Sequence, residues 1–245
     1  MMLELDCGNT LIKWRLIDTE RPHAGKAADV DGVLQDLRQA GVASLRGIRL
    51  VSVRGEAETA EIRTALERTF HRPCRVAQPA RELGGVRNGY QDYQALGMDR
   101  WLSVVGAYSL ARKACLVIDL GTAITADFVS AQGEHLGGFI CPGMPLMRKE
   151  LTSHTGRIRY EHAEPLNPGV CTPGRGTAQA VEGGCFWMIR GFVHEQCRLA
   201  KRLLDDDHEV LLTGGDAHMV FDAVPGARLA PDLVFAGLAI ACPIE

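Results

Sequence analysis

Two short stretches of this sequence place an acid and small hydrogen-bonding residues directly after an apolar run. They are LELDCGNT, from Leu3 to Thr10, and VIDLGTA, from Val117 to Ala123. In such a turn the backbone amides and a threonine hydroxyl can donate to phosphate oxygens, while the aspartate holds a cation directly or through water. Either stretch alone is explained as well by a common turn. Their repetition favours a phosphate site for a nucleotide.

The elements that must position these turns alternate between strand and helix patterns. Strands are predicted at 2–6, 11–17, 48–53, 115–119, 135–141 and 210–213, and helices around 33–41, 62–70, 101–110 and 177–204, with a further helix after 142–145. AQGE at 131–134 is typical of a hairpin turn. Because the strand, acidic turn and strand recur about half a chain apart, we predict an α/β protein with domains at 1–112 and 113–245 that face each other across a nucleotide cleft.

Composition narrows the class of protein. A chain of 245 residues that is 46% hydrophobic can bury a sizeable core. No apolar run approaches the roughly 20 residues of a membrane span, and no signal peptide precedes the first strand, so we expect a cytoplasmic protein that does not bind membranes. The eight cysteines lack zinc-site spacing and are interpreted as reduced core thiols. A net charge of −3 without a basic stripe argues against nucleic acid as a partner and favours a small molecule.

Several motifs together make the resemblance to a known family specific. DCGNT, DLGTA and TGGDA at 213–217 resemble the phosphate and adenosine motifs of the actin, Hsp70 and sugar-kinase superfamily. A larger set, in the family's order, resembles type III pantothenate kinase: DCGNTLIKW, NGY at 88–90, GMDRW at 97–101, VIDLGTA, GGFICPGM at 137–144 and GTAQAVEGG at 176–184. Only 21–36 and 157–173 lack landmarks. The resemblance implies two duplicated ribonuclease H-like (actin-like ATPase) domains, and ATP-dependent phosphorylation of pantothenate to 4′-phosphopantothenate, the first step of coenzyme A biosynthesis.

The resemblance also implies roles for individual residues. Asp99 is the expected catalytic base, Asp119 the expected ligand of K⁺ or NH₄⁺, and Asp6 lies near Mg²⁺, directly or through water. The expected ATP-binding residues are Asp6, Cys7, Gly8, Asn9, Thr10, Leu11, Ile12, Lys13 and Thr122. The expected pantothenate-binding residues are Tyr90, Gly97, Met98, Asp99, Arg100 and Thr177. Members of the family are homodimers with the active site near the subunit interface.

Each of these residues also has a purely structural interpretation. Asp99 would be a helix N-cap or first-turn acid, Arg100 a solvated helix residue, and Tyr90 an anchor for its loop. Thr177 would only start a helix, and Lys13 would be a strand residue facing water. GGDA would be a tight turn between a strand and a helix. The complete set of motifs favours function.

Two other functions are compatible with the same scaffold. One is a regulatory protein, since some relatives are described as transcriptional accessory factors and fold does not fix function. The other is a kinase for a sugar or small acid. An arginine such as Arg100 can hold a substrate carboxylate in two parallel hydrogen bonds, which favours pantothenate over a sugar. Release of ADP that depends on pantothenate separates the three.

Overall fold

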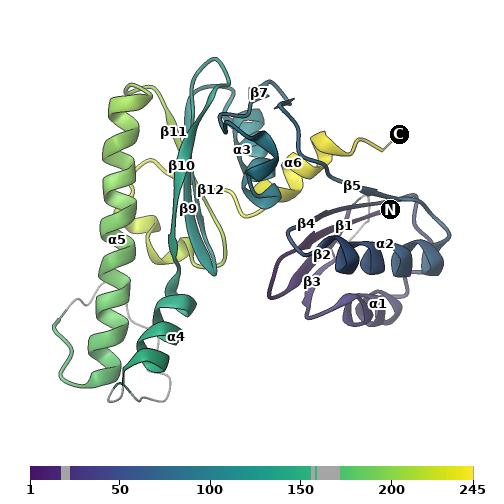
Figure 1. Cartoon of the computed structure of the whole chain (residues 1–245), viewed down its shortest axis with the longest axis horizontal. Coiled ribbons are helices and arrows are strands. Elements are labelled where there is room, and N and C mark those ends of the chain that lie inside the picture. Colours follow the sequence, from purple (N-terminus) through teal and green to yellow (C-terminus); the bar gives the residue numbers. More distant parts are fainter. Residues whose placement is uncertain (18–22, 156–157, 159–171, 245) are drawn as a thin grey trace. The chain divides into compact units, whose positions relative to one another are not determined.

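The computed structural model describes residues 1–17, 23–155, 158 and 172–244. The chain forms two compact units (Figure 1). The first unit contains Met1–Leu110 together with Asp232–Glu245, and the second contains Ala111–Pro231. Each unit is built around its own five-stranded sheet. No helix within the described residues is long and apolar enough to cross a membrane.

The first unit is built on a mixed sheet of parallel and antiparallel strands. Its strands, in the order β3-β2-β1-β4-β5, are β1 (Met2–Cys7), β2 (Ile12–Ile17), β3 (His23–Ala27), β4 (Gly47–Ser52) and β5 (Cys74–Val76). β1 pairs antiparallel with β2 and parallel with β4, while β2–β3 is antiparallel and β4–β5 is parallel. Helices α1 (Val30–Gln39) and α2 (Glu56–Phe70) pack against this sheet.

Strand β1 presents different chemistry on its two faces. Leu3, Leu5 and Cys7 are fully buried in a cluster with the apolar residues of α1 and α2. Because successive strand residues alternate between faces, Glu4 and Asp6 point to the opposite face. The face that packs against α1 and α2 therefore builds the core, and the acids lie on the opposite face.

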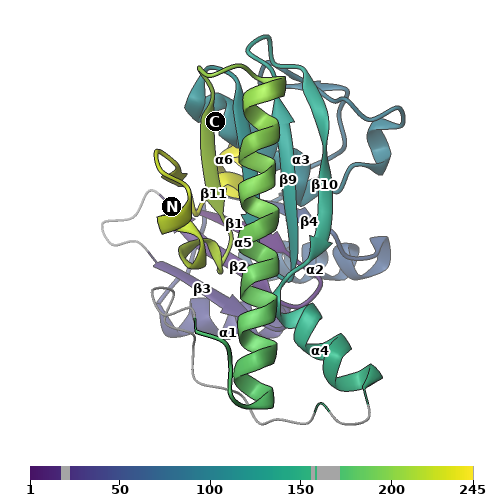
Figure 2. The same ribbon diagram turned by 90° about the vertical axis from the view of Figure 1, so that its left-hand side faces the viewer.

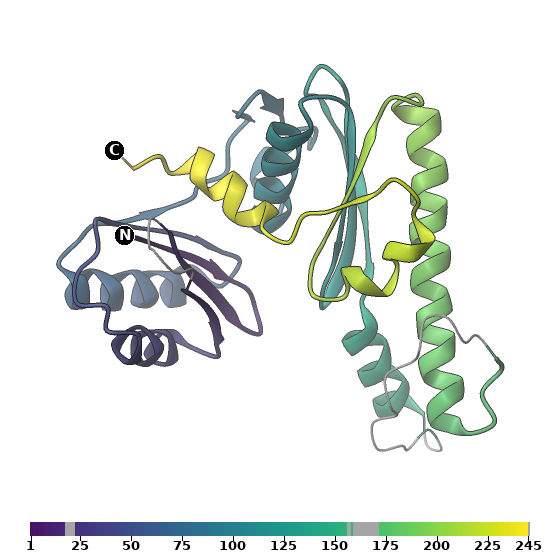
Figure 3. The same cartoon turned by 180° about the vertical axis from the view of Figure 1, so that it is seen from behind.

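The remaining elements of the first unit come from the middle and the end of the chain. They are the short strands β6 (Glu82–Leu83) and β7 (Val86–Arg87), the 3₁₀ turn η1 (Tyr93–Ala95), and the helices α3 (Met98–Ala111) and α6 (Leu233–Ala241). α3 and α6 lie side by side (Figure 3). A Cβ on Gly106 would be 3.0 Å from the backbone nitrogen of Gly237, so the two helices meet backbone to backbone.

The second unit repeats the sheet of the first. Its strands, in the order β10-β9-β8-β11-β12, are β8 (Cys115–Leu120), β9 (Ala123–Val129), β10 (His135–Pro142), β11 (Glu209–Thr213) and β12 (Arg228–Leu229). Its helices are α4 (Met144–His154) and α5 (Thr177–Leu203), with the 3₁₀ turns η2 (Ala217–Met219) and η3 (Phe221–Ala223). The long helix α5 runs along one face of the sheet (Figure 2), where Phe186 and Ile189 join Ile118 and Phe128 in the core.

Strand order and strand directions agree between the two sheets, which confirms the predicted duplicated ribonuclease H-like fold. β8 pairs antiparallel with β9 and parallel with β11, as β1 does with β2 and β4. The predicted turn at 131–134 joins β9 to β10, with Gly133 at φ 82°. Of the two segments without landmarks, 157–173 falls largely outside the described residues, as does Cys171.

The last segment of the chain packs with the first unit. Asp232–Glu245 belongs to the first unit, although these residues follow the second unit in the sequence. The reason is packing: α6 meets α3 at Gly106, and a Cβ on Gly47 of β4 would lie 2.8 Å from Ile244.

Candidate active site

The first acidic turn joins β1 to β2 and carries the predicted phosphate loop. Cys7 pairs with Ile12 across the two strands, so residues 8–11 form the loop, closed by the Gly8 amide, which donates to the Leu11 carbonyl at 3.1 Å. Asn9, Thr10 and Leu11 are exposed. The loop thus offers side chains and backbone to a ligand without further rearrangement of the strands.

Two of the predicted nucleotide-binding residues can contribute only their backbone. The side chains of Cys7 and Ile12 are fully buried in the core of the first unit. Burial raises the pKa of the Cys7 thiol to about 12, so this cysteine remains protonated at neutral pH. Cys7 is a packing residue, and the chemistry of the loop belongs to its neighbours.

Asp6 is the acid of the first turn, and its pKa is raised. It is 9% exposed, and Lys13, its partner across the strands, places Nζ 3.8 Å from its Oδ2. Burial is the main cause that raises the pKa of Asp6, and the nearby Asp99 carboxylate raises it further, while Lys13 lowers it. The structure therefore brings together Asp6, Lys13 and Asp99. A buried carboxylate with a second acid nearby attracts a cation.

Arg54, which the sequence analysis did not single out, forms a hydrogen bond to the backbone of the predicted phosphate loop. Arg54 follows β4, and its Nε donates to the Gly8 carbonyl at 2.8 Å. Its Nη1 donates to Glu58 Oε1 at 2.5 Å, and its Nη2 to the Ala28 carbonyl at 3.3 Å. The only signal in the sequence is a basic residue between a strand and a helix, which is too common to identify a role.

The GMDRW and NGY motifs meet at the start of α3. Arg100, which is 7% exposed, donates from Nη1 to the Tyr90 hydroxyl at 2.7 Å. The Tyr90 amide donates in turn to Asn88 Oδ1 at 3.0 Å. Arg100 is therefore not a solvated helix residue, and Tyr90 is held by both its backbone and its side chain. A buried guanidinium beside a phenol suits a carboxylate ligand.

Asp99 lies in the first turn of α3, and it is not the N-cap, because the helix begins at Met98. The Arg100 amide donates to Asp99 Oδ1 at 2.7 Å, and the Trp101 amide donates to the Gly97 carbonyl at 2.9 Å. A Cβ on Gly97 would lie 3.0 Å from Asp99 Oδ1. Gly97 thereby leaves the space beside the carboxylate open.

The second acidic turn joins β8 to β9. The Gly121 amide donates to the Ala123 carbonyl at 3.1 Å, and the exposed Thr122 accepts from the Gly143 amide at 2.9 Å through its carbonyl. Asp119 is half-buried at the end of β8 and pairs with Thr213 of β11. The turn is therefore fixed by the segment that opens α4.

Gly214, the first glycine of GGDA, approaches this turn closely. It has φ +89°, and a Cβ there would lie 2.5 Å from Asp119 Oδ1. The GGDA turn therefore lies beside Asp119, and the backbone of Gly214 is close to the Asp119 carboxylate. The turn does more than connect two elements.

Thr177 is the first residue of α5 and is exposed, with no side-chain cap at Gly176. The helix begins beside α4 and beyond the end of the sheet (Figure 2). Farther along α5, Glu182 is buried and forms an ion pair with Arg148 of α4. That ion pair ties the two helices together.

Comparison with known proteins decides the family. The family model for type III pantothenate kinase matches residues 2–199. A type III pantothenate kinase of Pseudomonas aeruginosa (strain UCBPP-PA14) is 56% identical over the full length of both chains, and one of Pseudomonas putida (strain F1) is 54% identical, again over both full lengths. This chain belongs to the type III pantothenate kinase family. Membership identifies it as a kinase.

Solved structures agree with this fold. A putative Baf family transcriptional activator from Campylobacter jejuni has a TM-score of 0.60 at 20% identity, covering 96% of this chain and 94% of that chain. A putative 2-dehydro-3-deoxygalactonokinase from Sinorhizobium meliloti has a TM-score of 0.54 at 16% identity, covering 98% of each chain. At these identities the likeness concerns the fold alone.

A kinase of the type III pantothenate kinase family uses ATP with a divalent metal, and the donor set of the first turn fits such an ion. No cluster of His, Cys, Asp and Glu among the described residues would form a cage for a metal. Mg²⁺ usually binds proteins through one or two carboxylates and completes its shell with phosphates and water. Asp6, buried beside a second acid, meets that requirement. Asp119 and the Leu120 carbonyl both approach Gly214, so a hard cation would find oxygen ligands there too.

Proposed function

We propose that this protein transfers the γ-phosphoryl group of ATP to the primary hydroxyl of pantothenate. The product is 4′-phosphopantothenate, the first intermediate on the way to coenzyme A. The observation that carries the proposal is the start of α3, where Asp99 lies near Asp6 and Arg100 is bonded to Tyr90. The residues proposed as base, phosphate loop and carboxylate anchor thus lie in one unit, in a chain of the type III pantothenate kinase family.

In the proposed reaction Asp99 accepts the proton of the pantothenate hydroxyl. The hydroxyl oxygen forms a bond to the γ-phosphorus as the bond from that phosphorus to the bridging oxygen of ADP breaks, and the proton remains on the Asp99 carboxylate. Enzymes of this class act mainly by positioning reactants and compensating charge. The half-exposed carboxylate of Asp99, with space left beside it by Gly97, suits that role.

The first acidic turn would bind the phosphates of the nucleotide. Asn9, Thr10 and Lys13 donate to phosphate oxygens, with Gly8 and Leu11 contributing backbone. Thr122 is proposed as a further nucleotide-binding residue, as the family resemblance implies. Asp6 holds Mg²⁺, directly or through water, and Asp119 holds K⁺ or NH₄⁺. When bound, these cations neutralise charge on the phosphates.

Pantothenate would bind through its carboxylate to Arg100 and Tyr90. The guanidinium is already fixed by its 2.7 Å hydrogen bond to the Tyr90 hydroxyl, so little side-chain entropy is lost on binding. Gly97 and Met98 are the neighbouring residues of this proposed site, and Thr177 is proposed as a further pantothenate-binding residue because the family resemblance implies it. Burial of Arg100 strengthens its interaction with an anion relative to the same contact in water.

We also propose that the protein is a homodimer. Large apolar side chains of the second unit are exposed on β10 and on α5, namely Leu136, Phe139, Ile140, Trp187 and Met188. Exposed apolar surface of this kind marks contact sites between proteins. A second copy of the chain is the partner that the family implies.

An assay of ADP formation tests the proposed function. Purified protein, MgATP and a panel of hydroxyl acceptors are combined with K⁺ and, in parallel, with Na⁺. We expect ADP release only with pantothenate and only with K⁺ or NH₄⁺. Release with a sugar or another acid in place of pantothenate would refute the substrate. Absence of release with every acceptor and cation would favour a regulatory protein on this scaffold.

A further inference from the structure

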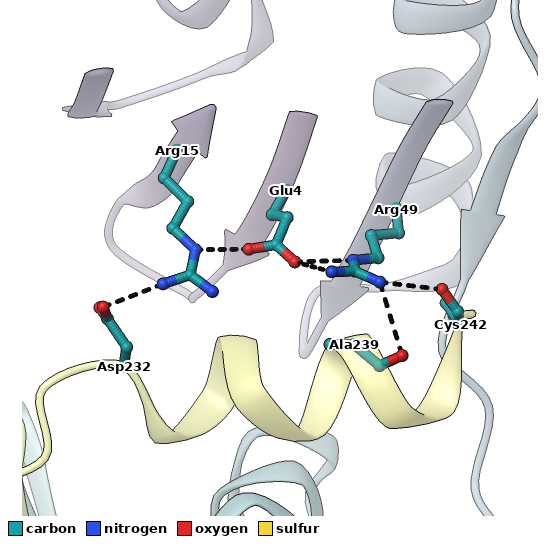
Figure 4. A network of polar contacts seen from close by, with 6 residues as sticks. All are labelled: Glu4, Arg15, Arg49, Asp232, Ala239 and Cys242. Carbon is teal, nitrogen blue, oxygen red and sulfur yellow. Dashed lines mark hydrogen bonds and ion pairs between the residues drawn. The ribbon is translucent and has the colours of Figure 1, made fainter. Parts of the chain in front are cut away.

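Glu4 is a buried charge that the proposed chemistry does not use. It lies in the middle of β1 and is fully buried, on the same face of the sheet as Asp6 (Figure 4). Its partners across the strands are Arg15 on β2 and Arg49 on β4, and its carboxylate forms an ion pair with each guanidinium. The Glu4 carboxylate does not use all the N–H groups of the two guanidinium groups. Nη1 of each arginine donates instead to a residue at an end of α6.

Both arginines of this cluster hold helix α6. Arg49 Nη1 donates to the carbonyls of Ala239 and Cys242, at 3.4 and 3.2 Å, at the C-terminal end of the helix. Arg15 Nη1 donates to Asp232 Oδ2 at 2.9 Å, at the N-terminal end. α6 is therefore fastened to β2 and β4 at its two ends (Figure 4).

Helix α6 in turn fixes helix α3. A Cβ on Gly106 of α3 would lie 3.0 Å from the backbone nitrogen of Gly237, and one on Gly237 would lie 2.8 Å from the Leu102 Cα. With no side chain between them, the two backbones cannot shift relative to each other without losing contact or colliding. The position of α6 therefore sets the position of α3, whose first turn carries Asp99.

We propose that Glu4, with Arg15 and Arg49, is a positioning group that fixes the spacing between Asp99 and Asp6 through α6 and α3. The elements that these contacts connect carry the two acids of the proposed site. Asp6 lies on β1, two residues after Glu4, and Asp99 lies on α3. The inference rests on the proposed function, because that function makes this spacing matter.

The second unit shows that the fold itself does not require the cluster. The row of its sheet that corresponds to Glu4, Arg15 and Arg49 is Val117, Asp127 and Leu211, which is mostly apolar. Buried ion clusters are often no more stabilising than apolar residues of similar volume. This cluster supplies directional hydrogen bonds to α6, which a row of apolar side chains could not form.

The test compares three changes with a matched control. Glu4→Gln removes the central charge, and the triple change Glu4→Leu, Arg15→Met and Arg49→Met replaces the whole cluster with apolar residues, so that no unpaired charge stays buried. Asp232→Asn removes only the exposed end of the network and leaves the core intact. The control, Asp127→Asn, alters a buried acid in the second unit that bonds to His135 at 2.9 Å.

Two readouts are measured on each full-length protein. Steady-state kinetics gives kcat and KM for ATP, and hydrogen exchange follows the backbone amides of 97–103. We expect the triple variant and Glu4→Gln to lose about ten- to a hundredfold in kcat, the range for small displacements of catalytic groups, with KM for ATP unchanged. We expect faster exchange at 97–103 in both, a smaller change of the same kind in Asp232→Asn, and neither effect in the control.

A triple variant that folds with the kcat and the exchange of the unchanged protein would overturn the proposal. If that variant does not fold, Asp232→Asn decides by the same two criteria. Loss of kcat accompanied by an equal loss in the control would also overturn it, since general destabilisation would then explain the result. If the unchanged protein does not phosphorylate pantothenate, the proposed function fails, and hydrogen exchange alone decides the positioning role.

Discussion

Asp6 combines two properties that oppose each other. As a proposed ligand of Mg²⁺ it must be ionised, yet burial and the nearby Asp99 raise its pKa. An acid whose pKa is higher in the folded state than in the unfolded state stabilises the fold only when it is protonated. Its ionisation therefore costs stability as pH rises through the folded-state pKa, a cost that a bound cation would offset.

The change Asp6→Asn separates these two properties. We expect the variant to lose phosphoryl transfer and to melt at a higher temperature than the unchanged protein at pH 7, because the ionised carboxylate is no longer buried. The difference in Tm should shrink as pH falls toward the ordinary pKa of an aspartate, where both proteins carry a neutral side chain. Calorimetry across that range measures it, with the exposed Asp206→Asn as control. A lower Tm for Asp6→Asn at pH 7 would contradict this account.

Gly143 tests the second turn. A Cβ there would collide with the carbonyl oxygens of Gly121 and Thr122 and disturb the hydrogen bond from its amide to Thr122. We expect Gly143→Ala to lose about 1–3 kcal/mol of stability by overpacking and to raise KM for ATP. Urea denaturation and initial rates measure these effects.

The matched control for Gly143 is Gly191→Ala in α5, where a Cβ meets nothing within 4 Å. This control should gain about 0.5–1 kcal/mol, because alanine is the better helix former. An equal KM for ATP in the two variants would refute the role of the second turn in nucleotide binding.

At the scale of elements, the contact between α3 and α6 depends on two glycines. Gly106→Ala would direct a Cβ onto the backbone of α6 at Leu233 and Gly237. We expect about 1–3 kcal/mol of destabilisation in urea denaturation, since backbone cannot move aside as a flexible side chain can. Gly183→Ala, in open space on α5, should not destabilise. If the two variants were equally stable, α3 and α6 would not be coupled as described.

The hydrophobic pattern of each element explains whether it could be predicted from the sequence. Strands β1 and β8 end in recognisable turns, and α2 shows Ile62, Leu66 and Phe70 at helical spacing. Strand β3, HAGKA, is mostly exposed and has no alternation to detect. Helix α6, LVFAGLAIA, is apolar on every side, so periodicity gives no signal. These two elements were not predicted.

At the scale of the whole molecule, repetition was visible in the sequence, and the return of the last segment to the first unit was not. Asp6 and Asp119 lie near the ends of equivalent strands, which is why aligning two short motifs predicted two duplicated domains. The return of Asp232–Glu245 to the first unit depends on contacts between residues far apart in the chain, such as Arg49 with Cys242. Arg54 and Glu4 went unnoticed for the same reason, since only folding brings them to their partners.

The proposed dimer is tested by placing charge on the exposed apolar residues. Ile140 on β10 is 62% exposed and Met188 on α5 is 64% exposed. We expect the unchanged protein to have twice the mass of one chain in light scattering, and Ile140→Glu with Met188→Glu to shift it to the monomer, because burying two carboxylates in an interface is costly. Leu229→Glu on β12 is the control. A dimer unaffected by both changes would place the interface elsewhere.

The most direct test of the central claim is pantothenate-dependent ADP formation by Asp99→Asn beside the unchanged protein. Asparagine keeps the shape of the side chain and cannot accept the proton. We expect kcat to fall about 10²- to 10⁴-fold, the usual contribution of a general base, while calorimetry shows unchanged binding of ATP. An Asp99→Asn protein that binds ATP and keeps its full kcat would contradict the assignment of Asp99 as the base of a pantothenate kinase.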